Sequence, residues 1–157
     1  MLPHPPASSS LHYVMPFRLA NWLRIALVLS GAMLVGLLVT AAMLTPNERG
    51  LGTHQQLGLP PCSLRTLAGI RCPSCGMTTS WSYMMRGRIV ESFASNTGGA
   101  LLALAAVVLG PWFLVSGFRG QWLGGVPNEW TLAGLSVGIM IVTLVDWGVR
   151  LYCGRGN

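Results

Sequence analysis

The residues best suited to chemistry are cysteines, and two of them belong to the short sequence Cys72-Pro73-Ser74-Cys75-Gly76. A Cys-x-x-Cys turn can present two thiolates to one metal ion, and structural zinc takes four tetrahedral ligands, usually cysteine and histidine. The spacing therefore indicates a zinc site, and no other cofactor is predicted. The candidate ligands are Cys62, Cys72, Cys75 and His54, with Cys153 as the alternative fourth ligand.

The same cysteines allow two other interpretations. They could form a structural disulfide or stay as inert buried thiols, and four cysteines allow three complete pairings. Cys72 and Cys75 could instead be the catalytic pair of a membrane thiol–disulfide oxidoreductase, because they precede an expected helix whose positive end would lower a thiol pKa. Oxidoreductases with this pattern carry it on a βαβ framework, and none is visible here. We leave enzyme activity open and favour a non-enzymatic role.

Other catalytic constellations are weak in this sequence. The chain has no lysine, so a phosphate-binding loop with its lysine is absent, and no two carboxylates lie close together in sequence. Ser80 and Ser82 lack a neighbouring base. The ten arginines are scattered at the ends of apolar runs and form no basic tract, so nucleic acid is not an expected partner.

The composition indicates an integral membrane protein. Hydrophobic residues make up 52% of the 157 residues and charged residues only 9%, whereas a soluble domain carries about 25% charged residues. Lipid must therefore cover much of the surface. We expect one all-α membrane domain over residues 22–157, after a disordered arm over residues 1–21 that is rich in proline, serine and histidine. His4 and His12 lie in this arm and are expected to be solvated.

Three apolar runs have the length that a membrane-spanning helix needs, about 20 residues. They cover residues 25–44, 98–118 and 130–147. A signal peptide cleaved after Ala42 is the rival interpretation of the first run, but its polar lead-in is long and its apolar length is that of a full span. Pro111 should kink the second span or end it early.

Two details of the third span suggest contacts. Gly134 and Gly138 are four residues apart and could form a small-residue face for another helix. Asp146 and Arg150 have the same separation, so the two side chains could pair across one helical turn.

The linker over residues 45–96 is too long for a simple turn. After the cysteines, Met77, Trp81, Met84 and Met85 recur at helical spacing, which predicts a helix over residues 77–86 with Gly87 as its C-cap. This helix is too short to span, so we expect it to be interfacial or re-entrant. A second short helix should cover residues 89–95.

Three spans place the linker and the C-terminus on the same side, so His54 and all four cysteines could meet. More arginines lie on that side than on the other, and the positive-inside rule therefore favours a cytoplasmic linker. Cytoplasmic thiols remain reduced, which favours a metal over a disulfide. The linker-side arginines are Arg49, Arg65, Arg71, Arg86, Arg88, Arg150 and Arg155, and the others are Arg18, Arg24 and Arg119.

Residues 52–96 resemble domain-of-unknown-function family 2752. The resemblance is carried by Cys62, the run Cys72-Pro73-Ser74-Cys75-Gly76-Met77-Thr78, then Arg86-Gly87, Phe93 and Asn96. The chain departs from the common family residues at Ser74, Thr79, Arg88 and Thr97. The resemblance implies a multi-pass protein of the bacterial inner membrane, and it brings no assigned activity.

The preferred hypothesis is an accessory or interaction protein. The cysteine site would fix the linker over one membrane face, where it meets the lipid bilayer and either another membrane protein or a second copy of the chain. The spans contain few of the polar residues that a transport path needs. An oligomeric transporter with Asn96 lining its path is therefore a weaker alternative.

Overall fold

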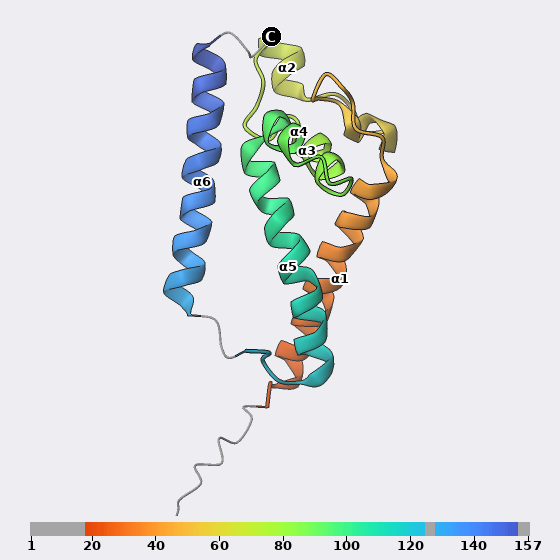
Figure 1. Ribbon diagram of the computed structural model, residues 1–157, viewed down its shortest axis with the longest axis vertical. Coiled ribbons are helices and arrows are strands. Elements are labelled where there is room, and N and C mark those ends of the chain that lie inside the picture. The colour runs from red at the N-terminus through yellow and green to blue at the C-terminus, as the bar shows by residue number, and fades with distance from the viewer. Residues whose placement is uncertain (1–17, 125–127, 154–157) are drawn as a thin grey trace, which may run out of the picture.

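The computed structural model describes residues 18–124 and 128–153, and within them every regular element is a helix (Figure 1). The predicted all-α fold class is confirmed. The helices are α1 (Asn21–Met43), the 3₁₀ helix η1 (Thr53–Leu57), α2 (Ser63–Ala68), α3 (Met77–Met84), α4 (Ile89–Ser95), α5 (Thr97–Arg119) and α6 (Glu129–Tyr152).

Three of these helices, α1, α5 and α6, are long and apolar enough to cross a membrane. A helix of 23 residues, such as α1, is about 34 Å long at 1.5 Å per residue, which exceeds the hydrocarbon core of a bilayer. All three predicted spans are therefore confirmed as helices. Helix α6 continues past the predicted end at Trp147 to Tyr152, and Asp146 pairs with Arg150 in this extension at 2.9 Å.

Helix α5 does not end early at Pro111, which lies inside the helix. A proline removes one backbone hydrogen bond and displaces the preceding turn. Helices in lipid often tolerate this change because neighbouring helices support the backbone. Gly110 lies close to Val35 and Leu34 of α1, so the turn before the proline is packed against a neighbour.

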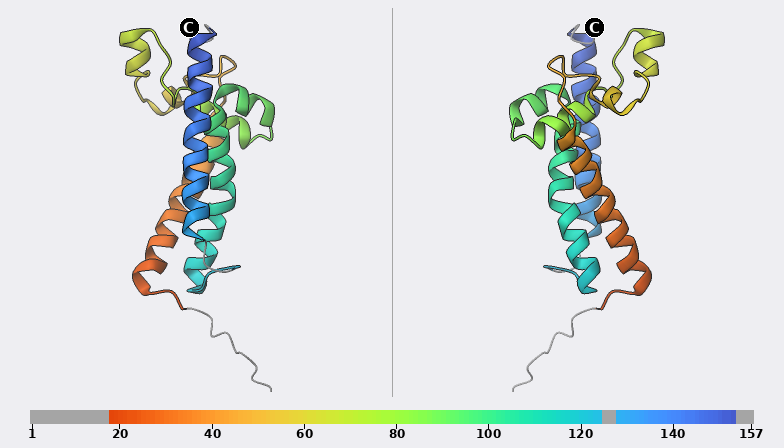
Figure 2. Two further views of the ribbon diagram at one scale, coloured as in Figure 1. Left: turned by 90° about the vertical axis from the view of Figure 1, so that its left-hand side faces the viewer. Right: turned by 90° about the vertical axis from the view of Figure 1, so that its right-hand side faces the viewer.

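Helices α1 and α5 run antiparallel and pack closely through glycines (Figure 2). A Cβ at Gly31 would lie 2.8 Å from Leu114 Cγ and 2.9 Å from the carbonyl oxygen of Gly110. A Cβ at Gly117 would lie 2.7 Å from a methyl carbon of Val28. The two backbones can approach this closely only because these positions carry no side chain.

Polar contacts join the start of α1 to the end of α5. The Arg24 guanidinium donates to the carbonyl oxygens of Gly117 and Phe118, each at 3.3 Å. A cation at the C-terminal end of a helix is stabilised by the helix dipole. Leu19 is buried and its N–H donates to the Gly120 carbonyl at 2.9 Å. The end of the predicted arm is thus held against α5, while residues 1–17, with His4 and His12, lie outside the described residues.

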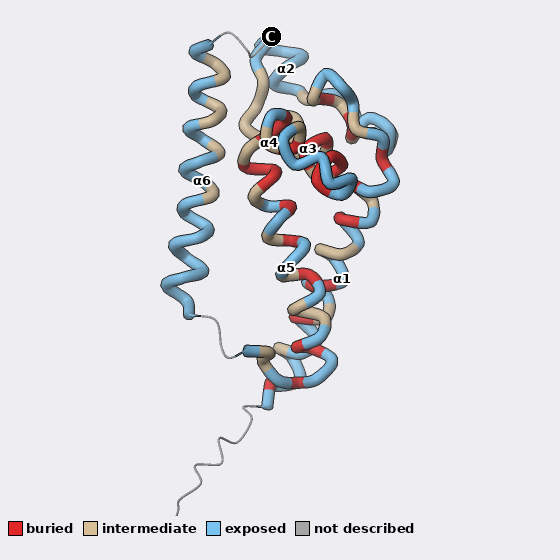
Figure 3. The backbone as a smooth tube through the Cα atoms, viewed as in Figure 1, coloured by how far each residue is buried: buried red, intermediate tan, exposed pale blue. Residues whose placement is uncertain are grey.

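Helix α6 is the least packed of the three. None of its residues is buried, and Figure 3 shows exposed residues along its whole length. No atom of the described residues lies within 4 Å of a Cβ placed at Gly134 or Gly138, so the small-residue contact predicted for this face is not made by residues 18–124 or 128–153. Helices α5 and α6 instead approach each other closely at Gly98 of α5, against which Thr143 of α6 packs.

The interior beside the linker is polar. The hydroxyls of Ser80 and Ser92 lie 2.9 Å apart, and that of Ser82 donates to the Leu44 carbonyl at 2.6 Å. All three serines are buried. Of the apolar residues at helical spacing after the cysteines, Met84 is buried in a cluster with Ala100 and Ala103, and Trp81 packs against it. Met85 is 37% exposed, and the serine side of the helix is buried as well. Small hydroxyl side chains allow helices to approach closely and satisfy one another when lipid surrounds them.

We predict that Gly31→Ala destabilises the protein by about 1–3 kcal/mol, because its Cβ would overlap backbone atoms of α5 that cannot move aside. The matched control is Gly36→Ala in the same helix, where nothing lies within 4 Å of the added methyl group. Alanine should be neutral there or stabilise the helix by up to about 1 kcal/mol. Unfolding in mixed detergent micelles measures both changes, and equal effects would contradict the packing described.

Candidate metal centre

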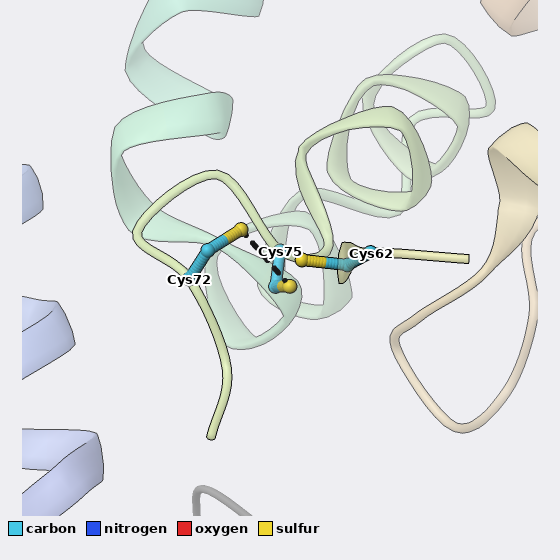
Figure 4. Close-up of side chains that lie close together, drawn as sticks. All are labelled: Cys62, Cys72 and Cys75. Atoms are coloured by element: carbon cyan, nitrogen blue, oxygen red, sulfur yellow. Dashed lines mark hydrogen bonds between the residues drawn. The ribbon is translucent and has the colours of Figure 1, made fainter. Parts of the chain in front are cut away.

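The linker brings three cysteine sulfurs together. Those of Cys62, Cys72 and Cys75 all lie within 4.8 Å of one another, and those of Cys72 and Cys75 are 3.1 Å apart (Figure 4). All three cysteines are half-buried and carry free thiols. Two thiolates bound to one tetrahedral zinc at 2.3 Å lie about 3.8 Å apart. A small outward movement of two sulfurs would therefore admit an ion.

The Cys72–Gly76 turn is defined by its own backbone. The Cys75 N–H donates to the Cys72 carbonyl at 3.0 Å, and the Met77 N–H donates to the Ser74 carbonyl at 3.1 Å. Gly76 has a φ of 88°, and a Cβ on it would lie 2.7 Å from the Ser95 carbonyl oxygen. Both the left-handed backbone and the close contact require glycine at this position.

Asn96 attaches this turn to α5, one of the three helices long and apolar enough to cross a membrane. Its side-chain N–H₂ group donates to the carbonyls of Pro73 at 2.9 Å and Cys75 at 3.1 Å. Its side-chain oxygen accepts the N–H of Gly99 at 2.6 Å, which caps the first turn of α5. Asn96 is only 3% exposed. The sequence singles out Asn96 for its family resemblance and as a transport residue, but misses this role; an asparagine directly before an apolar run is an N-cap signal.

Cys62 comes from a separate segment of the linker and is the residue directly before α2. The backbone N–H of Arg65, with a further contribution from the Cys72 thiol, lowers the pKa of Cys62 to about 7. A thiol that loses its proton this readily is suited to bind a metal or to attack a disulfide.

Cys75 is perturbed in the opposite direction. Burial, followed by its contact with the Cys72 thiol, raises the pKa of Cys75 to about 12. Cys75 directly precedes Gly76, the N-cap of α3, so the redox hypothesis correctly places it near a helix N-terminus. Its raised pKa makes Cys75 a poor attacking thiol. A bound metal ion would overcome the effect of burial on Cys75, because a thiol that coordinates a metal is deprotonated outright.

The two candidates for a fourth ligand lie in different places. His54 borders the same cavity as the three cysteines, about 310 Å³ in volume, and its Nε2 lies 3.2 Å from the Pro60 carbonyl oxygen. His54 is outside the three-sulfur cluster as it stands. Cys153 follows α6 on the same side of the molecule, as the topology predicts, but it is exposed and borders a different groove with Arg71.

Comparison with known proteins gives one match. Residues 62–110 match the model of a family described as "Protein of unknown function (DUF2752)". The match begins at Cys62 and includes Cys72, Cys75 and Asn96, and it confirms the family resemblance. No curated protein and no solved structure matches the chain.

We predict that Asn96→Ala destabilises the protein by about 2–4 kcal/mol, because it removes the α5 cap and leaves two buried carbonyls of the cysteine turn without a donor. Cys72 and Cys75 should then react faster with a maleimide. Asn128→Ala is the matched control, because Asn128 caps α6 through one exposed hydrogen bond. Its loss should cost only about 1 kcal/mol and leave the alkylation rate unchanged. Equal alkylation rates in the two variants would refute the role of Asn96.

Proposed function

We propose that this chain, a member of that family of unknown function, is an accessory membrane protein whose linker is fixed by one zinc ion bound to Cys62, Cys72, Cys75 and His54. The observation that carries the proposal is the convergence of three thiols from two separate segments within 4.8 Å. His54 on the wall of the same cavity supports it as the fourth ligand, because rotating away from Pro60 would free its Nε2. Cys153 stays the alternative.

The zinc would be structural. Four protein ligands close the tetrahedral shell and leave no position for a substrate, and binding to the folded loop contributes directly to folding. Three thiolates around Zn²⁺ leave a net negative charge. Arg65, which borders the same cavity, supports the site because its guanidinium would offset that charge. A reduced metal site also agrees with a linker on the cytoplasmic face of a bacterial inner membrane.

An interaction role is supported by the surface of the linker. Leu59, Leu64 and Leu67 lie outside the three long helices, and their exposed fractions are 52%, 39% and 87%. Their exposure favours contact with another membrane protein or with a second copy of the chain. The fixed loop that presents these side chains would be the binding surface of the protein.

We expect the protein, purified in detergent without added metal, to contain about one zinc per chain, with thiols that react only after a chelator is added. Cys62→Ser, Cys72→Ser and Cys75→Ser should each lose most of the zinc, because each removes one ligand. Cys153→Ser is the matched control and should keep it. Metal-free protein with freely reacting cysteines and unchanged stability would rule the site out.

The fourth ligand has its own test. We expect His54→Asn to weaken zinc binding, measured by competition with a chromogenic chelator, while Cys153→Ser leaves the affinity unchanged. The reverse result, a loss with Cys153→Ser alone, would assign the fourth position to Cys153.

The close approach of Cys72 and Cys75 also favours a second candidate function, thiol–disulfide exchange. The Cys72 thiolate would attack a substrate disulfide and form a mixed disulfide. The Cys75 thiolate would then displace the substrate, which leaves as a reduced dithiol while Cys72 and Cys75 become oxidised. The raised pKa of Cys75 weighs against this function, because Cys75 must lose its proton in the second step.

Under this second function, Cys75→Ser should accumulate a mixed disulfide with a partner, because the resolving thiol is gone. The double variant Cys72→Ser/Cys75→Ser should accumulate none. Non-reducing gels of membranes quenched in acid make the comparison. If neither Cys75→Ser nor Cys72→Ser traps a partner, exchange at this pair is excluded.

A further inference from the structure

A groove of about 290 Å³ lies where α4, the start of α5 and the end of α6 meet the linker. Arg71, Arg150 and Asp146 are its charged lining residues, Thr97 borders it, and Phe93 and Val149 provide apolar walls. It contains none of the three clustered cysteines. The groove adjoins the candidate metal centre, because Arg71, Asp146 and Arg150 also border a smaller pocket that Cys72 and Cys75 line.

The two arginines of this groove differ in their partners. Arg150 pairs with Asp146 at 2.9 Å through its Nε, and one terminal nitrogen donates to the Ser95 carbonyl at 2.8 Å. Arg71 has no ion pair among the residues that the structure describes. Its Nε is buried and finds no hydrogen-bond partner within the same residues. The groove therefore contains two guanidinium groups and one carboxylate, which pairs with Arg150.

The second groove beside Arg71 does not balance its charge. That groove is lined by Glu48, Arg49, Arg88 and Glu91, and Arg88 pairs with Glu91 at 2.9 Å. Its two glutamates are matched by Arg49 and Arg88, so the positive charge of Arg71 remains in excess. A buried donor without a partner and a cation without a counter-ion both indicate a missing anion.

The groove lies at the level where lipid headgroups are found if the three long helices cross the bilayer. The indole Nε1 of Trp147 donates to the Arg71 carbonyl at 2.7 Å, and tryptophan is typical of the boundary between hydrocarbon and water. Helix α5 begins at Thr97, on the rim of the groove, and α6 ends shortly after Arg150. Basic pockets between membrane helices at this depth commonly bind anionic headgroups.

We propose that Arg71 and Arg150 form a phosphate-binding site that takes the phosphate group of an anionic lipid. The Arg71 guanidinium can offer two parallel N–H donors to phosphate oxygens. Arg150 would add its remaining N–H donors and its charge, because its Nε and one terminal nitrogen are already bonded to Asp146 and Ser95. Phe93 and Val149 would contact the apolar part of the lipid next to its headgroup. Inorganic phosphate has the same charged group without that apolar part, so the test separates the two sources.

The test measures thermal unfolding of the full chain in zwitterionic detergent, titrated with phosphatidylglycerol, phosphatidylcholine or inorganic phosphate. We expect phosphatidylglycerol to raise the midpoint saturably and phosphatidylcholine to have little effect. Arg71→Gln should weaken the apparent affinity about tenfold or more, because it removes a charge-assisted contact. Arg119→Gln, which removes the same charge from the exposed far end of α5, should retain the wild-type affinity.

The same experiment separates binding from a structural role. Without lipid, Arg71→Gln should be as stable as the wild type or more stable, because it removes a buried cation that has no partner. If Arg71→Gln unfolds earlier under every condition and still responds to phosphatidylglycerol, the arginine is structural and the proposal is wrong. An Arg71-dependent response to inorganic phosphate alone would keep the site and exclude the lipid. Equal responses of Arg71→Gln and Arg119→Gln to phosphatidylglycerol would overturn the proposal.

Discussion

The fold depends on one buried amide, the side chain of Asn96. It donates to two carbonyls of the cysteine turn and accepts the Gly99 N–H in the first turn of α5, while its own backbone carbonyl accepts the Ser80 hydroxyl at 3.1 Å. The turn, α3 and the second long helix are therefore joined at one residue. Since a buried polar group without a partner is costly, these contacts must form together or not at all. The position of the cysteine pair is thus set by the start of a spanning helix.

Around this point the interior contains buried hydroxyl groups as well as a small apolar cluster of Met84, Ala100 and Ala103. Buried threonine and serine hydroxyls, such as the Thr53–Thr79 pair at 2.8 Å, hold the linker to α3, while large apolar side chains face outward along α1, α5 and α6. Lipid gives helices no hydrophobic reason to associate. Close packing through glycine and hydrogen bonds between small side chains replaces that driving force. This explains why α6, whose glycines at positions 134 and 138 have no described neighbour within 4 Å of an added Cβ, is the least packed of the three helices.

The cysteine cluster combines one thiol with a lowered pKa and one with a raised pKa. A working redox pair needs a thiolate that forms and leaves easily at each step. The burial that raises the pKa of Cys75 is unfavourable for exchange, but it is compatible with a closed metal site that excludes water. The groove at Arg71 differs from the cysteine cluster, because there a buried cation lacks an anion to pair with. These are the two places in the described structure where burial leaves a charge requirement unmet.

The sequence by itself determined the fold class, the three long helices, the α4 bounds and the Asp146–Arg150 pair. These features follow from hydrophobic run length and helical spacing, which are local properties of the chain. Three outcomes needed the tertiary structure: which face of α3 is buried, how Asn96 bridges two elements, and why Cys153 reaches the right side of the molecule without joining Cys62, Cys72 and Cys75. Each depends on contacts between residues far apart in sequence, and hydropathy carries no information about such pairings.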